Sequence, residues 1–165
     1  MKTSGKATTG NYFEDFSVGQ RLRHATPRTV HGGDLALYIA LTGDRRPVSS
    51  STEFARSLGY SRECVHDLLA FHIVFGKTVA DISLNAVANL GYSRVLFQRP
   101  VYPGDTLTAE SEVIGLRELS DGKRGVVYVT SRGFNQKGQE VLSFHRWVIV
   151  GCAMPEAEQG MNVAR

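Results

Sequence analysis

The sequence predicts an α+β fold in which a curved antiparallel sheet wraps around one long central helix. The run D-L-L-A-F-H-I-V-F-G-K-T-V, residues 67–79, is apolar almost all round, which is typical of a buried helix. Four segments with strand character follow it, and short turns rich in Gly, Asp and Asn join them. A helix this apolar needs a large partner, and the sheet is the one that the chain offers. We therefore expect the hot-dog architecture.

The segments before the long helix predict one strand and then a helix. Residues 21–30 are expected to form the first strand. Residues 34–42, D-L-A-L-Y-I-A-L-T, carry apolar side chains at helical spacing. Asp34 suits the N-cap of this helix, and Gly43 suits the position just after its end.

A second short helix and the four strands complete the prediction. Ser50 and Glu53 have the spacing of a capping box, and Gly59 is a favoured stop. The expected strands cover residues 95–101, 106–116, 125–134 and 141–150. Alternation in the last strand separates two faces, both largely covered: one holds Val141, Ser143, His145, Trp147 and Ile149, and the other holds Leu142, Phe144, Arg146, Val148 and Val150.

Length and composition exclude several classes of protein. The chain has 165 residues, which suits one domain over residues 11–150 with flexible ends at 1–10 and 151–165. Its 19 basic residues are scattered, so we expect no nucleic-acid partner. Cys64 and Cys152 lack the spacing of a disulfide framework or zinc site, and no metal is expected. No stretch reaches the roughly 18 apolar residues of a membrane span, and the first ten residues lack the apolar core of a signal peptide, so we expect a cytoplasmic protein without a membrane partner.

The most informative motif is T-G-D-R-R-P-V-S-S at residues 42–50. With Y-F-E-D-F-S-V-G-Q at residues 12–20, it resembles the MaoC-like dehydratase family, whose (R)-specific enoyl-CoA hydratases carry G-D-x-N-P-x-H. Asp44 and Pro47 match that pattern, whereas Arg46 stands in the place of the asparagine and Ser49 in the place of the histidine. A serine hydroxyl is too weakly basic near neutral pH to replace an imidazole.

Further motifs narrow the resemblance. They include H-A-T-P-R-T-V at residues 24–30, F-H-I-V-F-G-K-T-V-A-D-I-S-L-N at 71–85, and V-Y-P-G-D-T-L and H-R-W-V later in the chain. Over about residues 11–150 the chain resembles the first half of mesaconyl-CoA hydratases. Those enzymes are two fused hot dogs, roughly twice as long. In such fusions one half commonly holds the catalytic pair and the other half opens the substrate cleft.

The resemblance implies addition of water to an α,β-unsaturated acyl-CoA, with CoA present only as part of the substrate and no cofactor. It assigns catalysis to Asp44 and, by position, to Ser49. His66 matches a family histidine in A-H-G-M and could be the base that replaces the missing one. The alternatives are a turn aspartate at Asp44 and a structural histidine at His66. His72 is expected to be a hydrogen-bonded histidine in the core.

The resemblance also implies binding residues. Backbone N–H groups of Asp67 and Leu68, at the positive end of the long helix, would stabilise the thioester oxygen. Arg45 and Arg46 could hold the free carboxylate of a branched dicarboxylic, mesaconyl-like acyl group. The residues that could bind the CoA phosphates are Lys77, Arg94 and Arg99. A solvated surface role is the alternative for each of these cations.

Three functions stay open. The first is a hydratase or dehydratase of a short enoyl-CoA. The second is a non-catalytic hot-dog subunit that binds acyl-CoA or completes a separate catalytic subunit. The third is an acyl-CoA thioesterase, for which Asp67 is the candidate carboxylate. Because a lone hot dog leaves sheet edges exposed, we expect a homodimer or higher homo-oligomer, or pairing with a second hot-dog subunit.

Overall fold

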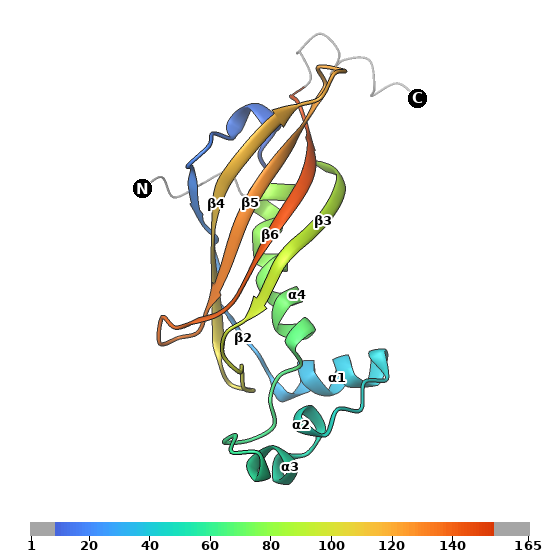
Figure 1. Cartoon of the computed structure of the whole chain (residues 1–165), viewed down its shortest axis with the longest axis vertical. Helices are drawn as coiled ribbons and strands as arrows, with labels where there is room; N and C mark the ends of the chain where they lie inside the picture. Colours follow the sequence, from blue (N-terminus) through green and yellow to red (C-terminus); the bar gives the residue numbers. More distant parts are fainter. Residues whose placement is uncertain (1–8, 154–165) are drawn as a thin grey trace.

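The computed structural model describes residues 9–153 and has the expected architecture: a curved antiparallel sheet wraps around a central helix (Figure 1). The strands are β1 Arg21–Arg23, β2 Arg28–Thr29, β3 Ala86–Phe97, β4 Thr106–Glu118, β5 Arg124–Phe134 and β6 Glu140–Gly151. They pair in the order β1-β4-β5-β6-β3, and β2 also pairs with β4. The helices are α1 Gly32–Thr42, α2 Pro47–Ser50, α3 Thr52–Ser57 and α4 Asp67–Thr78, with a 3-10 turn at Phe13–Asp15 and a π-helical turn at Val79–Ser83.

Helix α4 is the predicted central helix, and its inward side packs on the sheet. Its buried residues include Phe71, Ile73 and Val74, and the strands contribute Leu107, Leu142 and Phe144 to the same core. The fit is close at Gly133 of β5, where an added Cβ would lie 2.6 Å from Val74 Cγ2. Gly133 therefore leaves the room that the Val74 side chain occupies.

The expectation that α4 is a buried helix holds for the side that faces the sheet, and the expectation for His72 is wrong. Leu68 is 48% exposed, and His72 is exposed and not the expected core histidine. The sheet covers one side of the helix, and the described residues leave the other side open. Apolar composition alone does not reveal which side a single sheet will cover.

Several boundaries differ from the prediction. The strand expected from residue 95 begins at Ala86, and three register shifts against β6 interrupt its alternation. The strand expected over residues 21–30 is two short pieces, because Thr26 has a φ of 64° and Pro27 follows it. Other helix starts also shift. Asp34 lies inside the first turn of α1, where its carboxylate accepts from the His31 N–H at 2.9 Å, and the N-cap of α3 is Ser51 and not Ser50.

The expected flexible ends lie mostly outside the described residues. Gly151 is an exception, because it is the last residue of β6. No helix within residues 9–153 is both long and apolar enough to cross a membrane.

Candidate active site

The G-D-R-R-P motif forms the connection between α1 and α2. Gly43 ends α1 in the left-handed conformation, with a φ of 67°, and its N–H donates to Ile39 O at 2.9 Å. Asp44 follows, and its Oδ1 accepts from the Arg46 N–H at 2.9 Å, which closes a turn. Pro47 then begins α2 at a position where its missing N–H costs nothing. The motif is therefore a helix stop, a tight turn and a helix start, with the second carboxylate oxygen of Asp44 left for other contacts.

That second oxygen is bound by His66. The ring Nε2 of His66 is hydrogen-bonded to Asp44 Oδ2, although 22 residues separate the two in sequence. His66 is the N-cap of α4, and its Nδ1 accepts from the Leu68 N–H at 3.1 Å. Because Nδ1 accepts, the proton of a neutral ring must be on Nε2, which donates to Asp44. We call this contact the Asp44–His66 pair.

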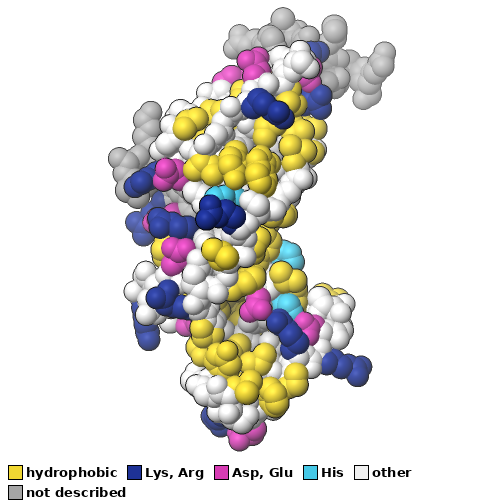
Figure 2. All heavy atoms as spheres, in the orientation of Figure 1, with side chains coloured by type: hydrophobic (Ala, Val, Ile, Leu, Met, Phe, Trp, Pro, Cys, Tyr) yellow, Lys and Arg dark blue, Asp and Glu magenta, His cyan; other side chains and the backbone are white. Residues whose placement is uncertain are grey.

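The surroundings hold the pair partly out of water. The His66 side chain is 7% exposed and that of Asp44 is 26% exposed. Tyr38 of α1 packs against the imidazole, with 4.9 Å between the ring centroids. Figure 2 shows histidine, acidic and basic side chains gathered where the helices at the lower end of the molecule meet the sheet.

Arg46 bridges two carboxylates at this site. Its Nε lies 3.2 Å from Asp44 Oδ2, and its Nη1 lies 3.1 Å from Asp67 Oδ2. The Arg46 backbone N–H, followed by the hydrogen bond from His66, holds the pKa of Asp44 below its usual value. Asp44 is therefore an ionised carboxylate at neutral pH, and Asp67 turns its carboxylate toward Arg46.

Ser49 lines a pocket that also contains Arg46 and Asp67, the two residues joined to the pair by a chain of ion pairs. It is buried on α2 and lines a space of about 420 Å³ together with Cys64, Asp67, Phe97 and Arg99. The imidazole of His66, and not the hydroxyl of Ser49, is bonded to Asp44. An ionised carboxylate next to an imidazole can accept and pass on the proton of a water molecule.

The residues predicted to bind substrate divide into two groups. Arg46, Asp67 and Leu68 gather at the start of α4 with the pair, but the Leu68 N–H already donates to His66. Arg45 is exposed on the same connection.

The three cations predicted to bind CoA phosphates are not brought together. Arg99 lines the pocket beside Ser49, and its Nη1 donates to Glu140 O at 2.8 Å. Lys77 lies toward the far end of α4, where it donates to Thr26 O and burial lowers its pKa. Arg94 is exposed on β3, and burial, followed by the Arg94 charge, lowers the pKa of His145.

Two polar features escaped the sequence reasoning. One is a buried chain in which Asp81 Oδ2 contacts His24 Nδ1 at 2.7 Å, His24 Nε2 contacts Ser111 Oγ at 2.8 Å, and Ser111 contacts Ser131 Oγ at 2.7 Å. The other is Arg146, which is fully buried. Strand alternation placed Arg146 on the same face as Phe144 and Val148, and this was the available signal for its burial.

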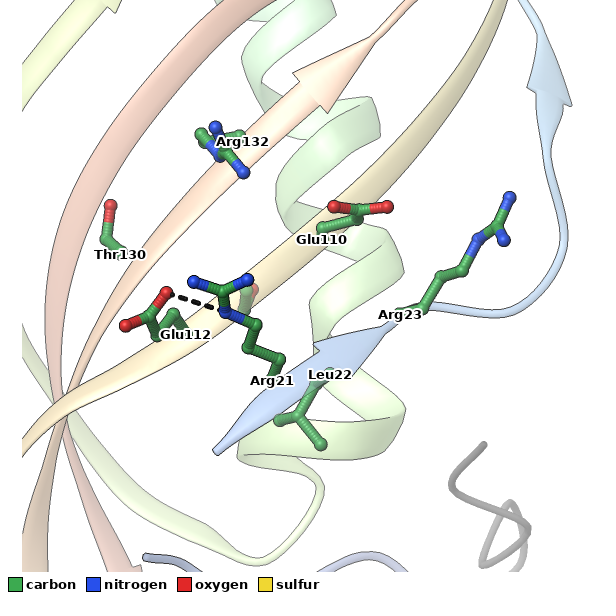
Figure 3. A pocket seen from close by; sticks show the side chains of 8 residues that line it. Arg21, Leu22, Arg23, Glu110, Glu112, Thr130 and Arg132 are labelled. Carbon is green, nitrogen blue, oxygen red and sulfur yellow. Dashed lines mark hydrogen bonds and ion pairs between the residues drawn. The ribbon is translucent and has the colours of Figure 1, made fainter. Parts of the chain in front are cut away.

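A charged hollow on the outer face of the sheet is a separate feature (Figure 3). Arg21 of β1 lies 3.2 Å from Glu112 of β4, and Arg23 is paired in register with Glu110. The Arg21 side chain is 78% exposed, so this is a solvated ladder of opposite charges with little energetic weight. Neither this hollow nor any other part of residues 9–153 contains a cluster of His, Cys, Asp or Glu suited to a metal ion.

The fold and the site define the class of protein. The model of the MaoC like domain matches residues 15–133, and the chain belongs to this family. The resemblance seen in the sequence motifs is thereby confirmed.

Individual relatives are also similar over most of the chain. The chain is 58% identical over 154 residues to the beta-methylmalyl-CoA dehydratase of Chloroflexus aurantiacus, covering 93% of this chain and 44% of that protein. It is 58% identical over 145 residues to the mesaconyl-CoA hydratase of Cereibacter sphaeroides, covering 88% and 42%. The crystal structure of a MaoC domain protein dehydratase from Chloroflexus aurantiacus matches with a TM-score of 0.88 and 57% identity, over 93% of this chain and 44% of that one. The chain thus spans less than half the length of these relatives.

Proposed function

We propose that this domain takes part in the hydration or dehydration of a short α,β-unsaturated acyl-CoA, with a branched dicarboxylic acyl group as the preferred substrate. One observation carries the proposal: His66 binds Asp44 at the start of the central helix, although the family's histidine position holds Ser49. The names of the two 58%-identical relatives support the choice of acyl group. Location in the cytoplasm remains a prediction.

The Asp44–His66 pair accounts for the proton movements. The ionised Asp44 accepts a proton from a water molecule as its hydroxyl adds to the β-carbon of the thioester, and the protonated pair supplies a proton to the α-carbon. Water is the only other reactant, so atoms and charge balance. Because the Leu68 N–H fixes the other ring nitrogen, His66 keeps Nε2–H directed at Asp44 and holds that carboxylate in place.

Stabilisation of the thioester oxygen needs a donor other than Leu68. The Leu68 N–H is already used by His66, so the Asp67 N–H is the remaining predicted donor. Because Arg46 bridges Asp44 and Asp67, Arg45 is the more available cation for a substrate carboxylate. Arg99 in the adjoining pocket is the preferred candidate for contact with CoA.

A matched set of variants tests the pair. The variants are Asp44→Asn, His66→Gln and the control Ser49→Ala. Hydration of mesaconyl-CoA by each is measured as the decrease in absorbance of its enoyl thioester. We expect kcat to fall about 10²–10⁴-fold in the first two, the usual contribution of general acid–base catalysis, and to change little in the control. Wild-type turnover in either of the first two variants would reject the pair as the catalytic centre.

A second candidate function is an accessory subunit. One observation favours it: a predicted donor for the thioester oxygen, the Leu68 N–H, is occupied by His66. If this holds, the chain alone would bind acyl-CoA without turnover, and a histidine-bearing hot-dog partner would restore the rate. Nothing comparable favours a thioesterase, because the candidate carboxylate, Asp67, is ion-paired with Arg46.

A further inference from the structure

Arg146 of β6 is a buried cation with two hydrogen-bond donors unused. Its exposure is 0%, and within residues 9–153 neither Nε nor Nη2 has a hydrogen-bond partner. The remaining nitrogen, Nη1, makes a long contact of 3.4 Å with Ser83 Oγ. Among these described residues no carboxylate lies within ion-pair distance of the guanidinium.

An aromatic ring covers this guanidinium, and that ring belongs to a cluster of aromatic side chains. Its central carbon lies 4.8 Å from the centroid of the Phe75 ring, and Arg146 is paired in register with Tyr92 of β3. Phe144 and Phe71 complete the group, with 4.9 Å between their ring centroids. Rings attract a cation but accept no strong hydrogen bond, so they leave Nε–H and Nη2–H unsatisfied.

The unused donors form one edge of the guanidinium. Nε–H and the adjacent Nη2–H point the same way, and this side-on fork matches the two oxygens of a carboxylate. Burial lowers the pKa of Arg146 to about 10, so the group is still charged at neutral pH. An uncompensated buried charge is costly, and a counter-ion would remove that cost.

The nearest sheet edge to this fork is strand β3, although the two unused nitrogens themselves are buried. β3 is the edge strand beside β6, and it runs along α4 (Figure 1). Tyr92 of β3 packs on Phe75 and Phe144 and is still 40% exposed, because no further strand of the described chain lies beyond it. A group that enters at this edge has to displace part of the aromatic cluster before it contacts Arg146, because both nitrogens are buried.

We propose that Arg146 forms a carboxylate-binding site inside the domain, entered between α4 and the β3 edge. This site is distinct from the Asp44–His66 pair. Phe75 lies nine residues after His66, which is a rise of about 13.5 Å along an α-helix. The two carboxyl carbons of a four-carbon diacid are under about 5 Å apart, so a mesaconyl group held at the pair does not reach Arg146. The carboxylate comes either from the far end of a longer acyl chain or from a side chain of a second hot-dog domain.

Thermal unfolding with small anions tests the site in the chain as it is. We expect sodium acetate to raise the unfolding temperature saturably, whereas acetamide and sodium chloride at matched concentration do not. Arg146→Met should abolish the acetate effect, and Arg146→Lys, which keeps the charge without the fork, should bind acetate roughly tenfold more weakly. An equal response of the wild-type protein to acetate and chloride, or an unchanged acetate effect in Arg146→Met, would overturn the proposal.

A second measurement does not depend on the variants folding. In protein labelled with ¹⁵N-arginine, acetate should shift one buried Nε–H resonance saturably, and acetamide should not. The absence of any such shift refutes the site. Two acyl-CoA ligands then identify the source of the carboxylate: decanoyl-CoA and its ω-carboxy analogue, since about ten carbons span the distance. If the protein binds the ω-carboxy form roughly tenfold more tightly, and Arg146→Lys loses this preference, the carboxylate belongs to an acyl chain. If the two ligands bind with equal affinity while acetate still binds, the carboxylate belongs to a second domain.

Discussion

Truncation of Phe144 should cost far more stability than truncation of Phe75, although the two rings belong to one aromatic cluster. Phe144 of β6 has 0% exposure and packs on Phe71 of α4, whereas Phe75, one turn later on the same face of α4, is only half-buried. Removing a fully buried phenylalanine side chain costs about 3–5 kcal/mol, because both the transfer free energy and a cavity contribute. For Phe75→Ala we expect roughly half of that or less, since solvent and side-chain movement can fill the space.

The difference is large compared with the total stability of a domain, which is typically 5–15 kcal/mol. At about 2–4 °C per kcal/mol, Phe144→Ala should lower the unfolding temperature by roughly 6–20 °C. Guanidinium unfolding can be followed through the single tryptophan, Trp147, which stacks on Tyr128 outside the core with ring centroids 4.5 Å apart. If Phe75→Ala proved the more damaging change, the packing of α4 on the inner face of β6 would be wrong.

Three further predictions address pH, packing and assembly. Burial lowers the pKa of His24 below 6.5, so the folded domain binds this proton less readily than the unfolded chain. Stability should fall as the pH drops below about 6.5, and urea midpoints of His24→Asn should lose that dependence. Gly133→Ala brings a methyl group against Val74 and should lower the free energy of unfolding, measured by chemical denaturation, by about 1–3 kcal/mol. The control Gly115→Ala, with ordinary contacts of 3.6 Å, should lower it clearly less. Equal losses of stability would argue against the tight contact. Light scattering should show a dimer or larger assembly at micromolar concentration. Leu90→Lys on the exposed edge strand should weaken this assembly. A monomeric wild-type protein would contradict the expectation.

The long helix and the strands β4 to β6 could be predicted because their patterns are regular. Residues 67–79 are apolar over a length that suits a helix, and β6 alternates between buried and half-buried residues from Leu142 to its end. β3 was shortened in the prediction because register shifts break its alternation and because its first residues follow the π-helical turn directly. Irregular pairing removes the periodicity on which a prediction from sequence depends.

The site was predictable in parts. Asp44 follows from the motif, and the matching histidine of A-H-G-M made His66 an alternative. Their contact across 22 positions depends on how α1 and α2 return to the start of α4, which local patterns do not encode. Arg146 shows the same limit, since alternation assigns its face but cannot show that the rest of residues 9–153 offers its Nε and Nη2 no partner.

The position of His66 explains how a site of this kind can keep an imidazole without the family's histidine. In the motif G-D-x-N-P-x-H, carboxylate and imidazole lie on one short segment, so the local turn sets their relation. Here the carboxylate stays on that turn, whereas the imidazole comes from the N-cap of α4, where the Leu68 N–H fixes its tautomer. Arg46 connects the two segments by contacting Asp44 on the turn and Asp67 on the helix. The geometry of the pair therefore depends on contacts between segments, and disturbing Arg46 should alter the pair without touching either of its members.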